Sequence, residues 1–299
     1  MESDPLVTVI CLCYNHEAFV IKTIDSVLNQ TYKNIEIILI DDFSTDMSVN
    51  VIEKYLLEKS VSINFIKNTT NLGLTKTFNK AVTYAKGSFL IDLACDDVLL
   101  PDCVERQIQT YNENDISETA IVFGNALNIN EEGNFLSYFF EVDENKFVKD
   151  KVLHHTSYTT ILNSGKTFCS VSAMLNRQIF DILGGYDENL AFEDLDYWLR
   201  ASRAYNIVFI DRPLICKRRV INSQGSQFHI KSSFSDKMDH SNLLILKKAL
   251  QMNRNSEEHK NLLKRVNYSL DRSLHAYKWG IAFQYALLKL KCHYKIWNA

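Results

Sequence analysis

The first hundred residues alternate between continuous apolar runs and segments in which apolar side chains recur every three or four positions. Residues 6–15 (LVTVICLCYN) are typical of a strand buried on both faces, and residues 17–30 have the spacing of a helix. The same alternation predicts strands at 34–42, 62–68 and 88–95, and helices at 47–59 and 75–87. Alternating strands and helices with short connections predict a parallel sheet covered by helices on both faces.

Polar side chains follow three of these expected strands. Tyr14 ends the first strand, the pair Asp41–Asp42 ends the second, and Asp96–Asp97 follows the strand at 88–95. Ligands of parallel sheets bind at the carboxyl ends of the strands, and adjacent carboxylates there can hold a hard divalent cation together with phosphate oxygens. The Asp96–Asp97 pair could equally cap the helix expected at 101–114 or stay solvated in a turn.

Composition narrows the class of protein. A chain of 299 residues with 46% hydrophobic residues can form one large domain, or a domain with an appendage. The seven scattered cysteines form no CxxC pair, and no apolar run reaches membrane-spanning length, so we expect a cytoplasmic protein with reduced thiols. The sequence has neither GxGxxG nor GxxxxGK[ST], which argues against a Rossmann dinucleotide site and a P-loop.

The C-terminal part has a different charge. From Phe234 onward there are twelve Lys and Arg against five Asp and Glu, although the whole chain has a net charge of -3. Residues 239–252 and 257–297 predict helices with a basic face and many aromatic residues. Such helices can lie in a membrane interface, which would place the protein peripherally at the inner face of the cell membrane. They can equally pack on the rest of the chain or on another subunit. Nucleic acid is not an expected partner, because the remainder is acidic and has no nucleic-acid-binding motif.

Three ordered segments carry a family resemblance. Residues 7–46, 71–102 and 184–202 resemble successive blocks of the inverting nucleotide-sugar glycosyltransferases of family 2, which have the GT-A fold. The resemblance extends over roughly residues 5–220. It implies an α/β fold with a Rossmann-like, mostly parallel sheet flanked by helices, followed by a C-terminal helical appendage.

The resemblance also implies a domain organisation and an activity. A GT-A domain would span residues 1–230, with a nucleotide-sugar half up to about residue 120 and an acceptor half at 121–230, followed by a basic helical region at 231–299. The implied reaction is a metal-dependent, inverting transfer of a hexosyl group, usually from a uridine diphosphate sugar, to a hydroxyl of a saccharide or lipid-linked saccharide acceptor. Such a transfer would serve surface polysaccharide or glycolipid synthesis.

Four residues take binding roles by this resemblance. Asp42 would hydrogen-bond the nucleobase, and Tyr14 would lie against it. Asp96 would meet the ribose or sugar, and Asp97 would bind the metal, Mn²⁺ or Mg²⁺.

A third segment supplies the expected base. Inverting displacement of a diphosphate needs a base that takes the acceptor's proton on the side opposite the leaving group. Leu195, Trp198 and Leu199 predict the apolar face of a helix, which leaves Glu193 and Asp194 in its first turn, where backbone amides stabilise negative charge. Acidic residues also favour this position without any catalytic role. The resemblance places the base at Asp194 and makes Glu193 the neighbour that positions the sugar or acceptor.

The sequence departs from the family pattern at two places. Family members often have an additional Asp where this chain has Ala94, and a Tyr-Arg-x-His segment late in the domain. Here that segment offers Arg218 and Arg219 but has Ile221 in place of His, and the next histidine is His229. These departures leave an alternative to the enzyme: a non-catalytic relative that binds a nucleotide sugar or a partner subunit.

Overall fold

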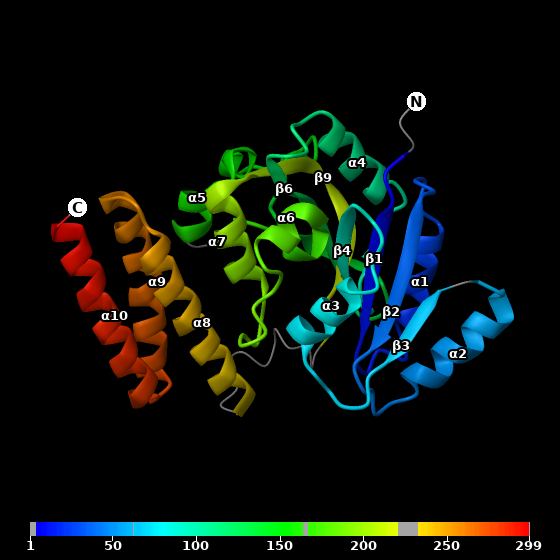
Figure 1. Cartoon of the computed structure of the whole chain (residues 1–299), viewed down its shortest axis with the longest axis horizontal. Coiled ribbons are helices and arrows are strands. Elements are labelled where there is room, and N and C mark those ends of the chain that lie inside the picture. The colour runs from blue at the N-terminus through cyan, green and yellow to red at the C-terminus, as the bar shows by residue number, and fades with distance from the viewer. Residues whose placement is uncertain (1–3, 62, 164–166, 221–232, 299) are drawn as a thin grey trace.

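The sheet organises the molecule. The computed structural model describes residues 4–61, 63–163, 167–220 and 233–298. In this part of the chain the strands form one sheet in the order β3-β2-β1-β4-β8-β6-β9-β5, with β7 paired to β6 (Figure 1). The strands are β1 (Val7–Cys13), β2 (Ile35–Asp41), β3 (Asn64–Lys67), β4 (Phe89–Ala94), β5 (Val98–Leu99), β6 (Thr119–Ile129), β7 (Phe135–Tyr138), β8 (Met174–Asn176) and β9 (Asn206–Arg218).

The N-terminal half is the parallel α/β unit that the sequence predicts. β1 pairs in parallel with both β2 and β4, and β2 pairs in parallel with β3. Every residue of β1 is buried, as expected for a continuous apolar strand in the middle of a covered sheet. The helices of this half are α1 (Val20–Leu28), α2 (Ser48–Lys59), α3 (Leu74–Val82) and α4 (Cys103–Asn112).

The second half of the sheet mixes strand directions. β8 runs antiparallel between β4 and β6, whereas β6 and β9 are parallel to each other. β9 was not expected from the sequence, because Pro213 and charged neighbours interrupt its apolar pattern. Register shifts in β6 around Asn125, opposite Pro213, accommodate the missing amide donor.

Short helices complete this half. They are α5 (Tyr158–Asn163), α6 (Arg177–Ile182), α7 (Asp194–Ala204) and the 3₁₀ turns Lys151–His155 and Ser170–Ser172. In α7 the predicted apolar face is confirmed, since Leu195, Trp198 and Leu199 are buried in the core. The Trp198 ring stacks on Phe168 at 4.7 Å between centroids.

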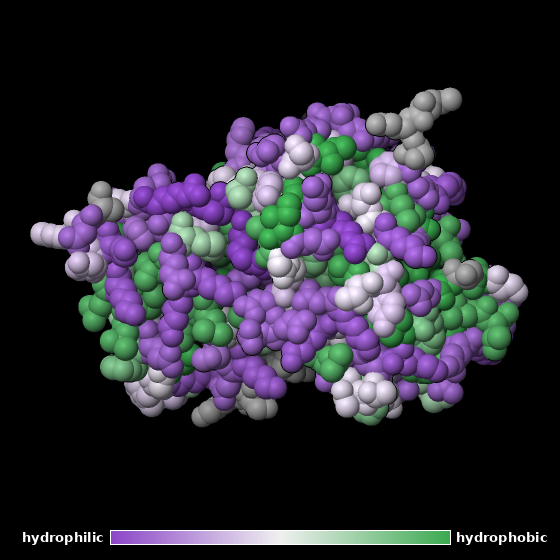
Figure 2. All heavy atoms as spheres, in the orientation of Figure 1, coloured by the Kyte–Doolittle hydropathy of each residue, from purple (hydrophilic) through white to green (hydrophobic). Residues whose placement is uncertain are grey.

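Three helices form the C-terminal end of the chain: α8 (Ser233–Met252), α9 (Ser256–His275) and α10 (Trp279–Trp297). They stand side by side at one end of the molecule, with α10 outermost (Figure 1). On the face shown in Figure 2, apolar residues gather along this outer edge. Across the described ranges, no helix has an apolar stretch long enough to span a bilayer.

Candidate active site

The strand ends bring three of the predicted positions to one edge of the sheet. Cys13 at the end of β1 is in register with Asp41 of β2, and Leu12 is in register with Ala94 of β4. The amide of Asp42 donates to the Cys13 carbonyl at 2.8 Å. Tyr14, Asp42 and the Asp96–Asp97 pair therefore follow neighbouring strands at the same edge, as expected for a ligand site of a parallel sheet.

Asp42 is buried, and its carboxylate hydrogen-bonds the loop that follows β3. Its carboxylate accepts hydrogen bonds from Asn68 Nδ2 at 2.8 Å, the Leu72 amide at 2.9 Å and the Gly73 amide at 2.8 Å. These contacts fix the loop between β3 and α3 against the end of β2. Tyr14 is 41% exposed beside it. Contact of Asp42 and Tyr14 with a nucleobase stays a prediction, and it would use a carboxylate lone pair that these three donors leave available.

Asp96 and Asp97 lie in a tight turn between β4 and β5. The Asp97 amide donates to the Ala94 carbonyl at 3.0 Å, and Asp97 Oδ1 accepts from the Arg218 amide at 2.7 Å. Neither carboxylate caps α4, because that helix begins at Cys103 with Asp102 at its N-cap position. The pair is thus held by β9 rather than by the helix that follows it.

Arg218 has a structural role in this turn. It is buried, its Nε donates to the Asp96 carbonyl at 2.9 Å, and its Nη1 donates to the carbonyls of Asn130 and Glu131. Its guanidinium lies over the Phe19 ring at 4.8 Å. These contacts occupy the side chain, so of the two arginines in the late segment only the exposed Arg219 is open to solvent. Ile221 and His229 lie outside the described residues.

The Asp96–Asp97 turn fits a divalent cation by the chemistry of its donors. Burial, and next the charge of Asp96, raise the pKa of Asp97 to about 8, although the Arg218 amide, Lys217 and the Arg218 guanidinium lower it. Within the described ranges, no group of three or more His, Cys, Asp or Glu side chains could hold a metal. A cation here would rely on one or two carboxylates plus oxygens of a bound diphosphate, which is common for Mg²⁺.

Glu193 and Asp194 are in the predicted place at the start of α7. Asp194 Oδ1 accepts from the Leu195 amide at 2.6 Å, and Ser170 Oγ lies 3.4 Å from Oδ2. Burial raises the pKa of Asp194, while the Leu195 amide, Lys217, Ser170 and Arg265 lower it. Burial, then the charges of Asp194 and Asp92, raise the pKa of Glu193 well above its usual range. The pKa of Asp194 is thus raised above its ordinary value, and that of Glu193 well above its own.

Asp92 is a further candidate for the site, beyond the residues predicted from the sequence. Along β4, Asp92 and Ala94 alternate with buried residues and lie on the partly exposed face, and Asp96 in the turn that follows is partly exposed too. Burial raises the pKa of Asp92 to about 7, while the Tyr186 hydroxyl lowers it. Its charge also acts on Glu193. The period-two pattern of β4 was the signal that could have placed this carboxylate on the face of the site.

Lys217 is the second such residue. Its ammonium lies close enough to Asp97 and Asp194 to lower the pKa of both. It also lies over the Phe139 ring at 5.5 Å from the centroid. Lys217 is partly exposed, in contrast to the buried Arg218 that follows it. A positive charge that acts on both the carboxylate turn and the start of α7 suits an anionic ligand.

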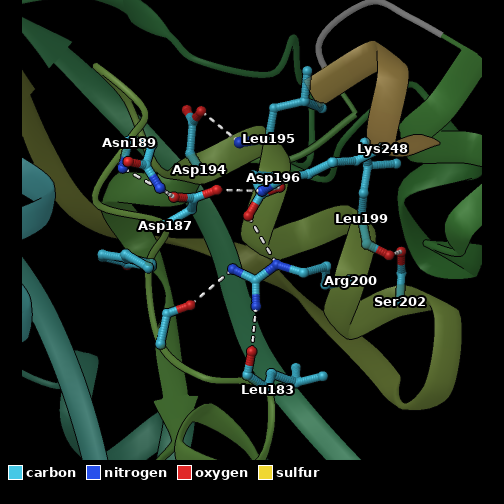
Figure 3. A network of polar contacts seen from close by, with 12 residues as sticks. Leu183, Asp187, Asn189, Asp194, Leu195, Asp196, Leu199, Arg200, Ser202 and Lys248 are labelled. Carbon is cyan, nitrogen blue, oxygen red and sulfur yellow. Dashed lines mark hydrogen bonds and ion pairs between the residues drawn. The ribbon is translucent and has the colours of Figure 1, made fainter. Parts of the chain in front are cut away.

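A partly buried ionic network joins α7 and the loop before it to α8 (Figure 3). Lys248 Nζ of α8 contacts Asp187 Oδ2 at 2.5 Å and Asp196 Oδ1 at 2.8 Å. Arg200 Nε contacts the other oxygen of Asp196 at 2.8 Å. Asp196 lies two residues after Asp194, and Asp187 belongs to the loop that leads into α7. The network therefore fixes both sides of the segment that carries Glu193 and Asp194.

One further contact reaches the same segment from α8, and one charged residue of α9 acts on it. The Ala191 amide donates to Ser241 Oγ of α8 at 2.8 Å. Arg265 of α9 donates from Nε to the Leu162 carbonyl at 2.8 Å, and its charge acts on Asp194. Helix α8 thus packs against the segment that contains the predicted base, and α9 contacts α5.

Comparison with known proteins fits this geometry. Residues 8–183 match the family described as "Glycosyl transferase family 2", which is more than half of the chain. The chain belongs to glycosyl transferase family 2. A family 2 relative, an uncharacterised glycosyltransferase of Methanocaldococcus jannaschii, is 32% identical over 230 residues, covering 76% of this chain and 75% of the relative. Glycosyltransferase GlyG of Streptococcus pneumoniae is 26% identical over 223 residues, covering 72% of this chain and 71% of GlyG.

Solved structures show the fold of this family 2 chain. S. aureus TarS 1-349 in complex with UDP-GlcNAc aligns with a TM-score of 0.61 at 16% identity, covering 90% of this chain and 73% of TarS. The mannosyltransferase PcManGT from Pyrobaculum calidifontis, in complex with GDP-Man and Mn²⁺, aligns with a TM-score of 0.62 at 15% identity, covering 96% of this chain and 74% of that one. The chain has the GT-A fold, with helices added at its C-terminal end.

Proposed function

We propose that this family 2 glycosyltransferase is an inverting, metal-dependent enzyme that moves a hexosyl group from a uridine diphosphate sugar to an acceptor hydroxyl. The observation that carries the proposal is the arrangement around Lys217, whose charge acts on both Asp97 and Asp194. A carboxylate turn suited to a cation and a carboxylate suited to a base thus lie within electrostatic reach of one cationic group. The titles of the structural neighbours, which name UDP-GlcNAc in one and GDP-Man with Mn²⁺ in the other, support a nucleotide-sugar donor.

In this proposal the donor binds at the strand ends of the half up to about residue 120. Asp42 and Tyr14 meet the nucleobase, and Asp96 meets the ribose or sugar. Asp97 holds Mn²⁺ or Mg²⁺, which when bound supplies positive charge against the diphosphate. Lys217 adds a second positive charge next to the leaving group, from within the acceptor half at 121–230.

Transfer then follows from the two carboxyls of α7. Asp194 takes the proton of the acceptor hydroxyl as that oxygen forms its bond to the anomeric carbon and the diphosphate leaves with the electron pair of the broken bond. The Leu195 amide keeps the Asp194 carboxylate oriented. Glu193, the residue before Asp194 and with a pKa raised by burial and by the charges of Asp194 and Asp92, positions the sugar or acceptor.

The acceptor is proposed only by class. A saccharide or lipid-linked saccharide would suit surface polysaccharide or glycolipid synthesis at the inner face of the cell membrane. The region at 231–299 would then be a basic helical appendage that also supports the base-bearing segment.

Calorimetric titration with UDP, GDP, CDP and TDP, each with and without Mn²⁺, tests the donor site. We expect UDP to bind tightly only with Mn²⁺, and Asp97→Ala to lose this metal dependence. Asp102→Asn is the control. It removes an exposed carboxylate outside the site, and the metal dependence of UDP binding should remain. If no diphosphate binds the wild type, the non-catalytic relative becomes the better description.

The base has a separate test. Asp194→Asn should bind the diphosphate like the wild type, yet release it from the nucleotide sugar roughly 100- to 10,000-fold more slowly, the effect typical of losing a general base. The assay needs no known acceptor, because water slowly hydrolyses the nucleotide sugar and the diphosphate released in this reaction can be measured. Unchanged hydrolysis and transfer in Asp194→Asn would assign the base to another residue.

A further inference from the structure

The outer face of α10 is an exposed apolar stripe. Six side chains on this helix are between 44% and 89% exposed: Trp279, Phe283, Leu287, Leu290, Tyr294 and Trp297. Their spacings are three and four residues, so they fall within an arc of about 80° at roughly 100° per residue. At its N-terminal end, Tyr277 extends the stripe through a ring contact with Trp279 at 6.2 Å.

Basic side chains border this stripe on both sides. At the same helical spacing, Lys289 and His293 lie along one border, and Lys291 and Lys295 lie along the other. The sequence of α10 contains no Asp or Glu. Long cationic side chains beside an apolar face can reach the polar headgroups while their stems stay among apolar atoms.

The opposite face of α10 anchors the helix to the protein. Its buried residues are Ala282, Tyr285, Leu288 and Cys292. The Tyr285 hydroxyl accepts from Asn242 Nδ2 at 2.8 Å and donates to the Asp239 carbonyl at 3.1 Å, both on α8. Lys278, just before α10, contacts Asp239 at 2.6 Å. The stripe is therefore presented by a fixed helix at the outer edge of the molecule (Figures 1 and 2).

We propose that the outer face of α10 binds the surface of a membrane that contains anionic lipids. The aromatic and aliphatic stripe enters the headgroup boundary, and the four bordering basic residues meet the lipid phosphates. A second copy of this chain fits less well, because two such faces would bring basic residues against basic residues with no acidic partner on either helix. This inference concerns where the protein is held and does not depend on the proposed reaction.

Cosedimentation of the full chain with vesicles tests the proposal. We expect binding to phosphatidylcholine vesicles containing about 30% phosphatidylglycerol, and at least about tenfold weaker binding to phosphatidylcholine alone. The variant Phe283→Ser/Leu290→Ser/Trp297→Ser should lose at least about tenfold in affinity. Leu57→Ser is the matched control, since Leu57 of α2 is 81% exposed and lies away from α10. Lys291→Gln/Lys295→Gln should weaken binding to anionic vesicles, whereas Lys54→Gln on α2 should not.

Tryptophan fluorescence gives an independent reading of the contact. Of the three tryptophans, Trp279 and Trp297 are in the stripe and Trp198 is buried. Vesicles should shift the wild-type emission to shorter wavelength, and the shift should vanish in Trp279→Phe/Trp297→Phe. Absence of vesicle binding at low salt, or equal binding by the triple serine variant, overturns the proposal. So does a wild-type dimer that the triple variant converts to a monomer, because a second copy would then cover the stripe.

Discussion

Replacement of Lys248 by Met tests the network that joins α8 to the base-bearing segment. Lys248 makes two ionic hydrogen bonds, to Asp187 and to Asp196, and the Asp196 side chain is only 1% exposed. The substitution keeps the length and apolar stem of the side chain while removing its charge. Asp196 retains Arg200 at 2.8 Å, so it does not become an isolated buried charge.

The expected loss of stability follows from these contacts. A hydrogen bond to a charged group contributes about 1.5–3 kcal/mol. Lys248 is 35% exposed and Asp187 is 23% exposed, so water replaces part of both interactions. We therefore expect a loss of about 2 kcal/mol in the free energy of unfolding. For a chain of this length such a loss lowers Tm by roughly 3 °C.

The neighbouring lysine provides the control. Lys247, also on α8 and partly exposed, donates only to the neutral Gln284 Oε1 at 3.1 Å. Lys247→Met removes the same unit charge, and we expect it to change the free energy of unfolding by no more than about 0.5 kcal/mol. Urea unfolding of Lys248→Met and Lys247→Met measures the difference. Adding Asp187→Asn and Lys248→Met/Asp187→Asn completes a double-mutant cycle, which gives the coupling between Lys248 and Asp187.

Turnover provides the second readout. If the network positions Asp194, Lys248→Met should lower kcat severalfold and leave the affinity for nucleoside diphosphate unchanged, and Lys248→Arg should restore part of kcat. Equal stability of Lys248→Met and Lys247→Met would show that the bridge contributes nothing to folding. Lower stability with an unchanged kcat would show that the network supports the fold but not the base.

Two other substitutions address the core of the site and the sheet. The pKa of Asp92 is raised to about 7 by burial, so between about pH 4 and 7 the folded state holds a proton that the unfolded state has lost, and stability falls as pH rises through this window. The Tyr186 hydroxyl hydrogen-bonds Asp92, and Glu193 and Cys11 are within reach of its charge. Asp92→Asn should flatten the dependence of Tm on pH, and parallel wild-type and variant curves would remove Asp92 as a cause. Gly87→Ala would place a Cβ 2.6 Å from the Thr8 amide, so we expect a loss of about 1–3 kcal/mol in denaturant unfolding. Gly280→Ala, with no heavy atom within 4 Å of the new Cβ, should lose none, and equal behaviour of the two variants would contradict the steric argument.

The sequence predicted the parallel half of the sheet because each element there has its own local signal. β1, β2 and β4 are apolar runs with short connections, and the helices between them have apolar residues at helical spacing. The start of α7 was predictable for the same reason, since its apolar face and acidic first turn are adjacent in sequence. β9 was not predictable from the sequence, because a proline and charged residues interrupt its apolar pattern. Its stability comes from pairing with β6.

The types of group in the site can be predicted from the sequence: polar side chains after three strands, a carboxylate pair at the start of a helix, and a basic, aromatic C-terminal region. How each charged group is used depends on the tertiary structure. The Arg218 amide contacts Asp97 across 121 residues of sequence, which leaves Arg218 structural and its neighbour Lys217 facing the carboxylates. Lys248 reaches Asp196 across 52 residues. Charges interact through space at distances of a few ångströms, and residue spacing along the chain fixes such distances only within one helix or strand.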